Sequence, residues 1–479
     1  MADERQHGID VSNTRGAPAG SMRELLLVAF PLVVSAGSFS LMNVVDRVFL
    51  ARLSVEALAA SMPSSMLVWT VMSLALGVAG YTNAFASQYE GAGRKERVTS
   101  AIWQGFWIAL VGGISLLPLM LFARQIFSSM GHAPEVVELE ITYFIWLCPV
   151  AIPTLLSTVF SAYFAARKKT SVIMWVNVST AILNAVADYI LIFGLGPIPG
   201  FGMRGAAVAT ILAQSTGSIV LGYLMFRQGH RDGYPFAATF GVDWKLLKRM
   251  VRYGIPNGIH MFMDIGAFTF FVALVGQLGT NEQAATNLAF TLNSLAFVPM
   301  FGMGTAIVTL VGHRVGEGRP ELAVKTVWKA FYLSGSYMII FAAIYLSLPD
   351  LILSPFTHES EAAAFKEIRP IVIVLLQYIA LYTFFDAMAI VFGSAIRGAG
   401  DIWFSLFFSI ACSWLLMVVP SVLAVRYGWG LHGCWISITV AVLVMGIGFL
   451  TRFQLGYWKS MRVIESPHDT LPDSETTNG

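Results

Sequence analysis

Charged side chains are scarce in this chain of 479 residues, because Asp, Glu, Lys and Arg make up only 12% of it. A soluble protein carries about 25% charged residues. Hydrophobic residues account for 56% of the sequence. This composition argues against a soluble enzyme and against a nucleic-acid-binding protein, and it favours a protein embedded in a membrane.

Cysteine is rare as well. The three cysteines, Cys148, Cys412 and Cys434, all stand in apolar sequence and form no CxxC pair. They are typical of small buried hydrophobic side chains, so neither a disulfide framework nor a zinc site is expected.

Motifs for nucleotide binding and catalysis are missing from the sequence. It contains no GxxxxGK[ST] loop, no HExxH, no GxSxG and no cluster of metal ligands. We therefore expect no ATP hydrolysis on this chain, no cofactor and no enzymatic activity. A cleavable signal peptide is not expected either, because the first apolar stretch, which begins near Leu25, is longer than the about 7–15 residues of a signal-peptide core.

Long apolar stretches recur along the whole chain. A bilayer core requires about 20 apolar residues per helix, and Gly-rich segments such as 91–93 and 398–400 separate the stretches. The pattern predicts an all-α polytopic membrane protein. Its twelve membrane-spanning helices are predicted at residues 24–50, 57–86, 99–123, 138–164, 170–193, 203–226, 250–278, 283–311, 325–348, 368–396, 402–426 and 430–455.

The Lys and Arg residues predict the orientation of these helices. If the amino terminus is cytoplasmic, 23 of them fall on the cytoplasmic side and 7 on the other side. Cytoplasmic segments of membrane proteins carry such an excess of Lys and Arg. We therefore expect both termini to be cytoplasmic.

An internal repeat divides the chain into two halves. Pro31 and Trp103 recur as Pro256 and Trp328, each 225 residues later. The offset encloses six helices, so we expect two six-helix lobes related by a pseudo-two-fold axis, with a binding site near their interface. The predicted division is a disordered cytoplasmic tail at 1–21, an N-lobe at 22–226, a cytoplasmic linker at 227–249, a C-lobe at 250–455 and a polar cytoplasmic tail at 456–479.

Four carboxylates, Asp46, Asp188, Asp264 and Asp386, fall inside the predicted spans. Each costs about 2.5–3.5 kcal/mol at a helix centre on insertion scales, so positions facing lipid are unfavourable. No Lys or Arg lies deep in a predicted span to neutralise them. They predict a cation-binding or proton-carrying site, and the alternative is a structural role at helix ends with bonds to backbone or water.

Polar residues one helical turn away favour the first interpretation, since residues four apart share a helix face. Asn184 precedes Asp188 in this way, and Tyr382 precedes Asp386. Oxygen-rich faces suit hard cations such as Na⁺.

Several motifs resemble those of the multidrug and toxic compound extrusion (MATE) family. Pro31, fifteen residues before Asp46, resembles the first helix of the family, and segments 88–94 and 312–318 resemble its loops in the two halves. The most specific match is YTFFD at 382–386 followed by GSAIRG at 393–398. The resemblance covers about residues 22–455. It implies a twelve-helix, two-lobe antiporter that exports organic compounds in exchange for a cation.

The resemblance implies two alternative coupling sites. The site in the C-lobe would use Asp264, Asp386, Tyr382 and Thr291, with Asp264 in place of the family's usual glutamate and Thr291 where an asparagine is common. The site in the N-lobe would use Asp46, Asn184, Asp188 and Thr210. Because both sets are present, the coupling lobe stays open, and so does the choice between Na⁺ and H⁺.

Pro31 and Pro256 each fall in the first third of a long helix. Each removes a backbone hydrogen bond and permits a bend. The bend is either static or changes during transport. The resemblance further implies small organic substrates of cationic or amphipathic character, a monomer in contact with membrane lipid, and a bacterial inner membrane.

Two other functions stay open. A flippase for lipid-linked glycans, from a related superfamily, would require Arg or Lys in its cavity to bind phosphate, whereas the buried charges here are acidic. An integral-membrane enzyme would require a deep catalytic constellation, for which His260 and Asp264, one helical turn apart, form the sole candidate pair.

Overall fold

The computed structural model describes residues 17–354 and 362–465. Helices dominate this part of the chain, and twelve helical stretches in it are long and apolar enough to cross a membrane. This confirms the predicted fold class.

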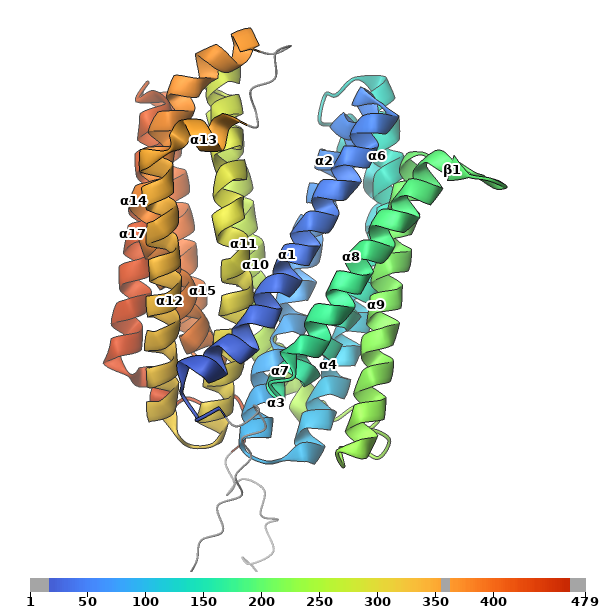
Figure 1. The fold of residues 1–479 in the computed structure, drawn as a ribbon, viewed down its shortest axis with the longest axis vertical. Helices are drawn as coiled ribbons and strands as arrows, with labels where there is room; N and C mark the ends of the chain where they lie inside the picture. The colour runs from blue at the N-terminus through green and yellow to red at the C-terminus, as the bar shows by residue number, and fades with distance from the viewer. Residues whose placement is uncertain (1–16, 355–361, 466–479) are drawn as a thin grey trace, which may run out of the picture.

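The first six spans form one half of the molecule, the N half, drawn from blue to green in Figure 1. The helices of the N half are α1 (Met22–Leu53), α2 (Val55–Gly80), α3 (Thr82–Gly91), α4 (Lys95–Leu116), α5 (Ala123–Ser128), α6 (Pro134–Leu147), α7 (Ala151–Ala166), α8 (Thr170–Phe193) and α9 (Met203–Arg231). A small hairpin of β1 (Gly194–Leu195) and β2 (Ile198–Pro199) follows α8, where the sequence predicted only a turn.

The remaining six spans form the C half, drawn from yellow-green to red in Figure 1. The helices of the C half are α10 (Trp244–Gly276), α11 (Thr280–Gly316), α12 (Pro320–Ser347), α13 (Pro349–Leu353), α14 (Ala362–Ala399), α15 (Ile402–Ile410), α16 (Val419–Arg426) and α17 (Gly430–Leu455). A π-helical stretch, Ala411–Val418, joins α15 to α16 within one span.

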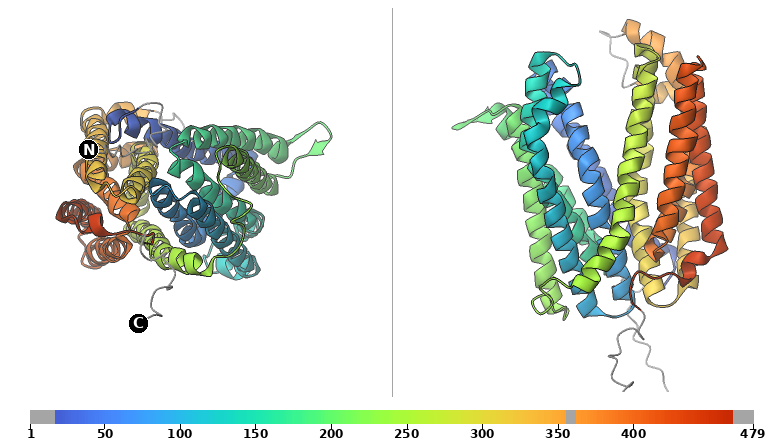
Figure 2. Two further views of the ribbon diagram at one scale, coloured as in Figure 1. Left: turned by 90° about the horizontal axis from the view of Figure 1, so that it is seen from below. Right: turned by 180° about the vertical axis from the view of Figure 1, so that it is seen from behind.

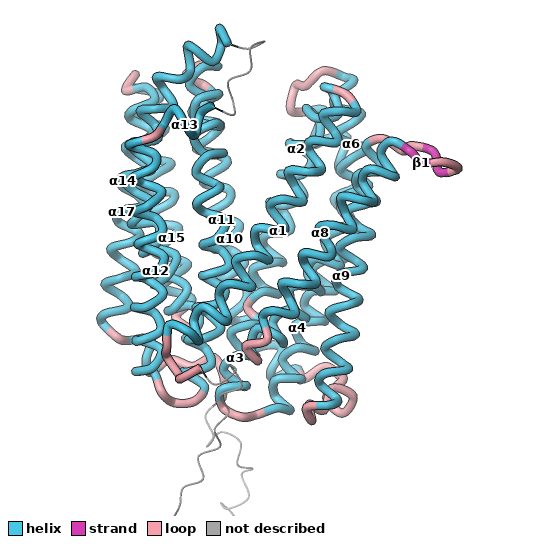
Figure 3. Tube along the Cα trace, in the orientation of Figure 1, coloured by secondary structure: helices cyan, strands magenta, loops and turns pink. Residues whose placement is uncertain are grey.

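The described part of the chain begins and ends at one end of the bundle, which we call the terminal end, and α13 and the hairpin lie at the opposite, far end (Figure 1). The halves stand side by side at the terminal end and diverge toward the far end, as the view from behind in Figure 2 and the tube in Figure 3 also show.

The hydrophobic cores explain this shape. The largest cluster of buried side chains, near the terminal end, combines residues of both halves, such as Phe85 and Leu310. Two further large clusters each stay within one half, around Phe144 in the N half and Trp435 in the C half. Of these three clusters, only the one near the terminal end therefore joins the two halves.

Small residues let the halves approach closely in a pseudo-symmetric way. A Cβ placed on Gly77 would lie 2.5 Å from the Cα atom of Gly258, and one on Gly302 would lie 2.5 Å from the Cα atom of Val33. In the 225-residue repeat, Val33 corresponds to Gly258 and Gly77 to Gly302. The two contacts are thus copies of one another, as the predicted two-fold relation requires.

The first and last described segments, 17–21 and 456–465, are folded, although the sequence predicted tails there. Ala17 is buried, and the hydroxyl of Ser21 caps α1 by accepting a hydrogen bond from the backbone of Glu24. At the other end, residues 456–465 pack back onto the bundle through the buried Trp458 and Val463. Apolar burial outweighs the polar composition of both segments, and the remainder of the predicted tails, 1–16 and 466–479, lies outside the described residues.

The predicted linker at 227–249 is also shorter than expected. The helix α9 continues to Arg231 and α10 starts at Trp244, so residues 232–243 alone connect the halves. The side chain of Asp243 caps α10 by accepting from the backbone N–H groups of Lys245 and Leu246. The division into domains otherwise stays a prediction.

Candidate functional site

The predicted site residues of the N half come together at one place. Asp46 projects from α1, and Asn184 and Asp188 project from α8; all three are buried. With its amide nitrogen facing the two carboxylates, Asn184 lies 2.8 Å from Oδ1 of Asp46 and 3.3 Å from Oδ2 of Asp188. The second oxygen of Asp188 has no hydrogen-bond partner in the described part of the chain.

Because the one amide of Asn184 reaches both carboxylates, Asp46 and Asp188 lie close to each other. Two negative charges at such a distance in a low-dielectric setting repel each other strongly, so the pair favours a shared proton or a bound cation. The buried Tyr143 on α6 interacts electrostatically with both carboxylates. Tyr143 could not be found from the sequence, because α6 is distant from Asp46 and Asp188 along the chain.

Thr210 lies on α9 and is buried, but its hydroxyl donates to the backbone oxygen of Ala206 in its own helix, at 3.0 Å. Within the described ranges, 17–354 and 362–465, no hydrogen bond joins Thr210 to Asp46 or Asp188.

The predicted site residues of the C half are more dispersed. Tyr382 and Asp386 lie on α14, where Tyr382 is buried and Asp386 is half-buried. Thr291 on α11 is exposed and donates to the backbone oxygen of Asn287 at 2.8 Å. Within the described residues, no hydrogen bond or ion pair joins Asp264 to Tyr382, Asp386 or Thr291, so no polar contact links Asp264 to the rest of the second predicted set.

Asp264 instead belongs to a small network between α10 and the last-but-one span. The hydroxyl of Ser413 donates to Oδ1 of Asp264 at 3.1 Å, and Nε2 of His260 lies 3.4 Å from Oδ2. The same His260 nitrogen is 2.9 Å from the hydroxyl of Ser409. Ser413 lies in the π-helical stretch, a local geometry that is frequent at functional sites.

One arginine acts on this network from the end of a span, where the sequence also placed it, so it does not contradict the expectation that no Lys or Arg lies deep in a span. Arg397 lies inside the span that ends at Ala399, and its guanidinium interacts electrostatically with Asp264 and His260. Its place near the end of α14 led the sequence pattern to assign it to the helix boundary.

The two halves are tied together at the terminal end by a buried carboxylate on α1. Glu24 is 1% exposed and accepts from Nζ of Lys168 at 2.8 Å and from Nη2 of Arg314 at 2.5 Å. Lys168 precedes α8 in the N half, whereas Arg314 lies on α11 in the C half. Arg314 also binds Glu317; although burial favours the neutral acid, hydrogen bonds from His313 and Arg314 lower the pKa of Glu317 to about 2.

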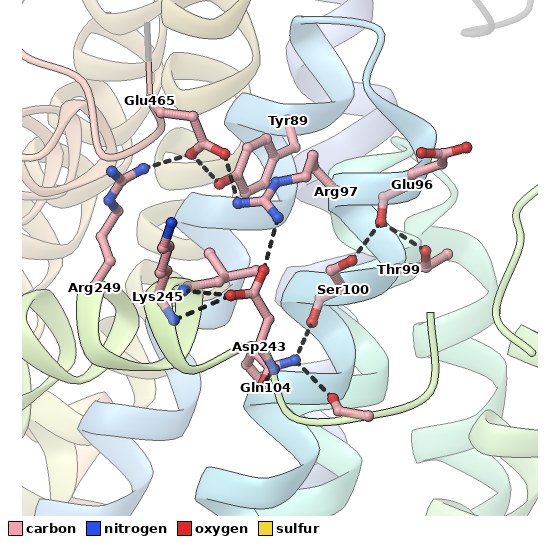
Figure 4. Close-up of polar contacts among 12 residues, drawn as sticks. Tyr89, Glu96, Arg97, Thr99, Ser100, Gln104, Asp243, Lys245, Arg249 and Glu465 are labelled. Carbon is pink, nitrogen blue, oxygen red and sulfur yellow. Dashed lines mark hydrogen bonds and ion pairs between the residues drawn. The ribbon is translucent and has the colours of Figure 1, made fainter. Parts of the chain in front are cut away.

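A second carboxylate, that of Glu465, also joins the two halves (Figure 4). Glu465, in the folded segment 456–465, binds Arg97 of α4 at 2.5 Å, Arg249 of α10 at 2.5 Å and the hydroxyl of Tyr89 at 2.6 Å. Burial acts against its ionisation, but the hydrogen bond from Tyr89 and the charge of Arg97 lower the pKa of Glu465. We refer to Glu24 and Glu465 as the two clasps.

Backbone contacts complete the seal at the terminal end. The amide of Gln88 donates to the backbone oxygens of Gly398 and Ala399, at 3.0 and 3.1 Å, and its oxygen accepts from the backbone of Val463 at 3.0 Å. The hydroxyl of Tyr81 donates to the backbone oxygen of Arg397 at 2.8 Å. Charged and polar side chains of both halves thus close the terminal end.

Comparison with known proteins gives one family and one fold. The family model described as MatE matches residues 31–190 and 256–423. The probable multidrug resistance protein NorM of Bradyrhizobium diazoefficiens is 26% identical over 436 residues, which cover 90% of this chain and 93% of that protein. The protein of the same name from Xanthomonas campestris pv. campestris is 27% identical over 446 residues, covering 90% of this chain and 94% of that protein.

Solved structures share the fold. An outward-facing conformation of a multidrug resistance MATE family transporter superposes with a TM-score of 0.84 at 24% identity, covering 94% of this chain and 99% of that chain. The eukaryotic MATE transporter AtDTX14 superposes with a TM-score of 0.81 at 21% identity, covering 91% of this chain and 96% of that chain.

Proposed function

Because the chain belongs to the MATE family of transporters, we propose that it exports organic compounds, cationic or amphipathic in character, in exchange for Na⁺ or H⁺. The observation that carries this proposal is the buried pair of Asp46 and Asp188. Such a pair holds a proton or a cation to relieve the repulsion between its charges. A cationic substrate and the coupling ion would compete for the same negative charge, and such competition is reciprocal in free energy.

The coupling site proposed here consists of Asp46, Asp188 and Asn184 in the N half. Among the described residues, no Lys or Arg forms an ion pair with either carboxylate, and the charge of the neighbouring Arg47 acts on Asp46 without such a pair. The role of Asp264, Asp386, Tyr382 and Thr291 in the C half remains a prediction, since no polar contact joins Asp264 to the other three among the described residues.

The shape of the molecule supports transport by alternating access. The seal at the terminal end and the divergence of the halves at the far end together correspond to one of the two states that such a cycle requires. We assign the terminal end to the cytoplasm, because the excess of Lys and Arg lies there. The structure would then be the state that faces outward, and the bends at Pro31 and Pro256 would contribute to the conversion.

The orientation is tested by cysteine labelling in intact cells. Ala238→Cys lies in the connection between the halves at the terminal end, and Ser129→Cys lies between α5 and α6 at the far end; both positions are exposed. The native Cys148, Cys412 and Cys434 are buried. A membrane-impermeant maleimide should label Ser129→Cys and not Ala238→Cys, and the reverse pattern would contradict the assignment.

Efflux itself is tested with purified protein in sealed liposomes. A fluorescent organic cation is loaded, and Na⁺ and pH gradients are imposed separately without any nucleotide. We expect at least one of the two gradients to drive movement of the dye against its own gradient. Movement that ignores both gradients, or that requires ATP, would contradict the proposal.

A further inference from the structure

A basic depression lies on the terminal end of the molecule, between the start of α10 and the folded segment 456–465. It consists of two adjoining hollows of about 950 and 740 Å³, which share Lys245, Arg249 and Glu465. Nine Lys or Arg side chains and three carboxylate side chains line the two hollows. The depression therefore carries a large excess of positive charge.

Most of this positive charge is not compensated inside the protein. Arg97 and Arg249 surround the carboxylate of Glu465 (Figure 4). Five other cations of the depression form no ion pair with any residue of the described ranges 17–354 and 362–465, and all five side chains are exposed. These five are Lys245, Lys248, Arg252, Lys459 and Arg462.

The five cations come from two elements that meet at this place. Lys245, Lys248 and Arg252 lie on the first turns of α10, and Lys459 and Arg462 lie on the segment 456–465. A single anion in the depression would contact both elements at once. Phosphate groups suit such a site, because Arg and Lys form strong charge-assisted hydrogen bonds with them.

Exposed aromatic side chains flank the depression and indicate its depth in the membrane. Trp244, next to Lys245, is 75% exposed, and Tyr457, two residues before Lys459, is 54% exposed. Trp and Tyr are enriched at the level of the lipid headgroups. The depression thus lies where the phosphates of a bilayer lie, and α10 runs at the edge of the molecule in the view from below (Figure 2).

We propose that this depression binds the phosphate-bearing headgroup of an anionic phospholipid. The lipid would join α10 of the C half to the segment that carries Glu465, and would so support the clasp between Glu465, Arg97 and Arg249. The proposal is independent of which compound is transported and of which ion drives transport.

The test is lipid binding to the purified full-length chain, followed by native mass spectrometry in detergent. Phosphatidylglycerol is compared with phosphatidylcholine of the same acyl chains, and inorganic phosphate is a third arm. We expect phosphatidylglycerol to bind more tightly than phosphatidylcholine. The triple variant Lys248→Gln, Lys459→Gln, Arg462→Gln should lose about a hundredfold in phosphatidylglycerol affinity, at the energy per basic residue typical of anionic membranes.

A matched control removes three charges elsewhere at the terminal end. Arg227→Gln, Arg319→Gln and Lys325→Gln affect exposed cations without ion pairs to any described residue, and this triple variant should keep wild-type affinity. The thermal unfolding midpoint of each variant without added lipid checks that the fold is intact.

Three results would overturn the proposal. Equal affinity for the two lipids would exclude recognition of the anionic headgroup. Equal losses in the two triple variants would indicate a general effect of net charge, and displacement of phosphatidylglycerol by millimolar inorganic phosphate would indicate a site for the free anion. The same binding measurement is repeated with a chain that ends at Glu465. If phosphatidylglycerol bound more tightly than phosphatidylcholine only after this truncation, residues 466–479 would occupy the depression instead of a lipid.

Discussion

Asp46 and Asp188 are two buried acids in the membrane-spanning part of the protein that share the amide of Asn184. Replacing either acid with Asn keeps the shape and removes one charge. Asp46→Asn and Asp188→Asn should therefore abolish gradient-driven efflux, while the thermal unfolding midpoint stays at or above that of the wild type. Efflux from liposomes and thermal unfolding in detergent measure the two quantities.

The control for this pair of variants is Glu56→Gln, which changes an exposed carboxylate in the same half and should leave efflux unchanged. Asp386→Asn compares the halves. If Asp386→Asn abolished efflux and both N-half variants kept it, the coupling site would lie in the C half and our assignment would be wrong.

Glu465 allows a prediction about pH. Its pKa is lowered below the ordinary glutamate value of 4.5, so its ion pairs contribute stability above that value and lose it as the pH falls through the lowered pKa. The Glu465→Gln variant should unfold more easily than the wild type by about 1.5–3 kcal/mol, the usual strength of a hydrogen bond to a charged group.

The difference in unfolding midpoint between the wild type and Glu465→Gln should stay constant from pH 8 to about pH 5, and shrink only in stronger acid. The clasp is then insensitive to physiological pH, and if the proposed coupling ion is a proton, it would act on the carboxylates inside the spans instead. A difference that vanished already near pH 6 would contradict this separation of roles.

For single residues of the candidate site, the sequence predicted which residue types take part but not which side chains they contact. Asn184 and Asp188 were paired by their spacing on one helix, and the motif around Asp46 added the third member. Tyr143, Ser409, Ser413 and the clasp at Glu465 could not be predicted, because each depends on how distant helices pack rather than on periodicity within one helix.

Two helix ends, those of α3 and α11, fit together through glycine. A Cβ on Gly91 would lie 2.0 Å from the backbone oxygen of His313, and one on Gly316 would lie 2.1 Å from that of Gln88. Gly91→Ala and Gly316→Ala should each destabilise the sealed state by about 1–3 kcal/mol, because neither backbone can move away easily. Thermal unfolding in detergent measures the loss.

Gly37→Ala in α1 is the control for these substitutions, since its Cβ would meet no atom within 4 Å. It should be neutral or slightly stabilising, because Ala is the better helix former. Equal destabilisation by all three substitutions would show that the close approach of α3 and α11 makes no specific contribution to stability.

Hydropathy predicted every span at the level of elements, since a stretch of about 20 apolar residues is a strong signal. Interruptions inside spans were not predicted. The second span changes from α2 to α3 at Tyr81, and the eleventh contains the π-helical stretch Ala411–Val418. No proline stands next to Tyr81, so the first irregularity arises from packing against neighbouring helices, whereas Pro420, two residues after Val418, removes a backbone donor that would bond back into the π-helical stretch.

For the molecule as a whole, the internal repeat predicted the two-fold relation, and the reciprocal contacts of Gly77 and Gly302 agree with it. The conformation could not be predicted from the sequence. A repeat is compatible with a seal at either end, and only the packed contacts of Glu24, Glu465 and Gln88 distinguish the two ends.

We expect the sealed terminal end and the diverging far end to interconvert during transport, with the clasps stabilising the present state. Two pairs of spin labels measure this by pulsed electron paramagnetic resonance in nanodiscs. Ser129→Cys with Leu351→Cys spans the far end, and Ala238→Cys with Lys325→Cys spans the terminal end; all four positions are exposed. In the variant with Glu24→Gln and Glu465→Gln, we predict a shorter distance at the far end together with a longer distance at the terminal end. Distances that stay unchanged at both ends, or that change in the same direction, would contradict the account.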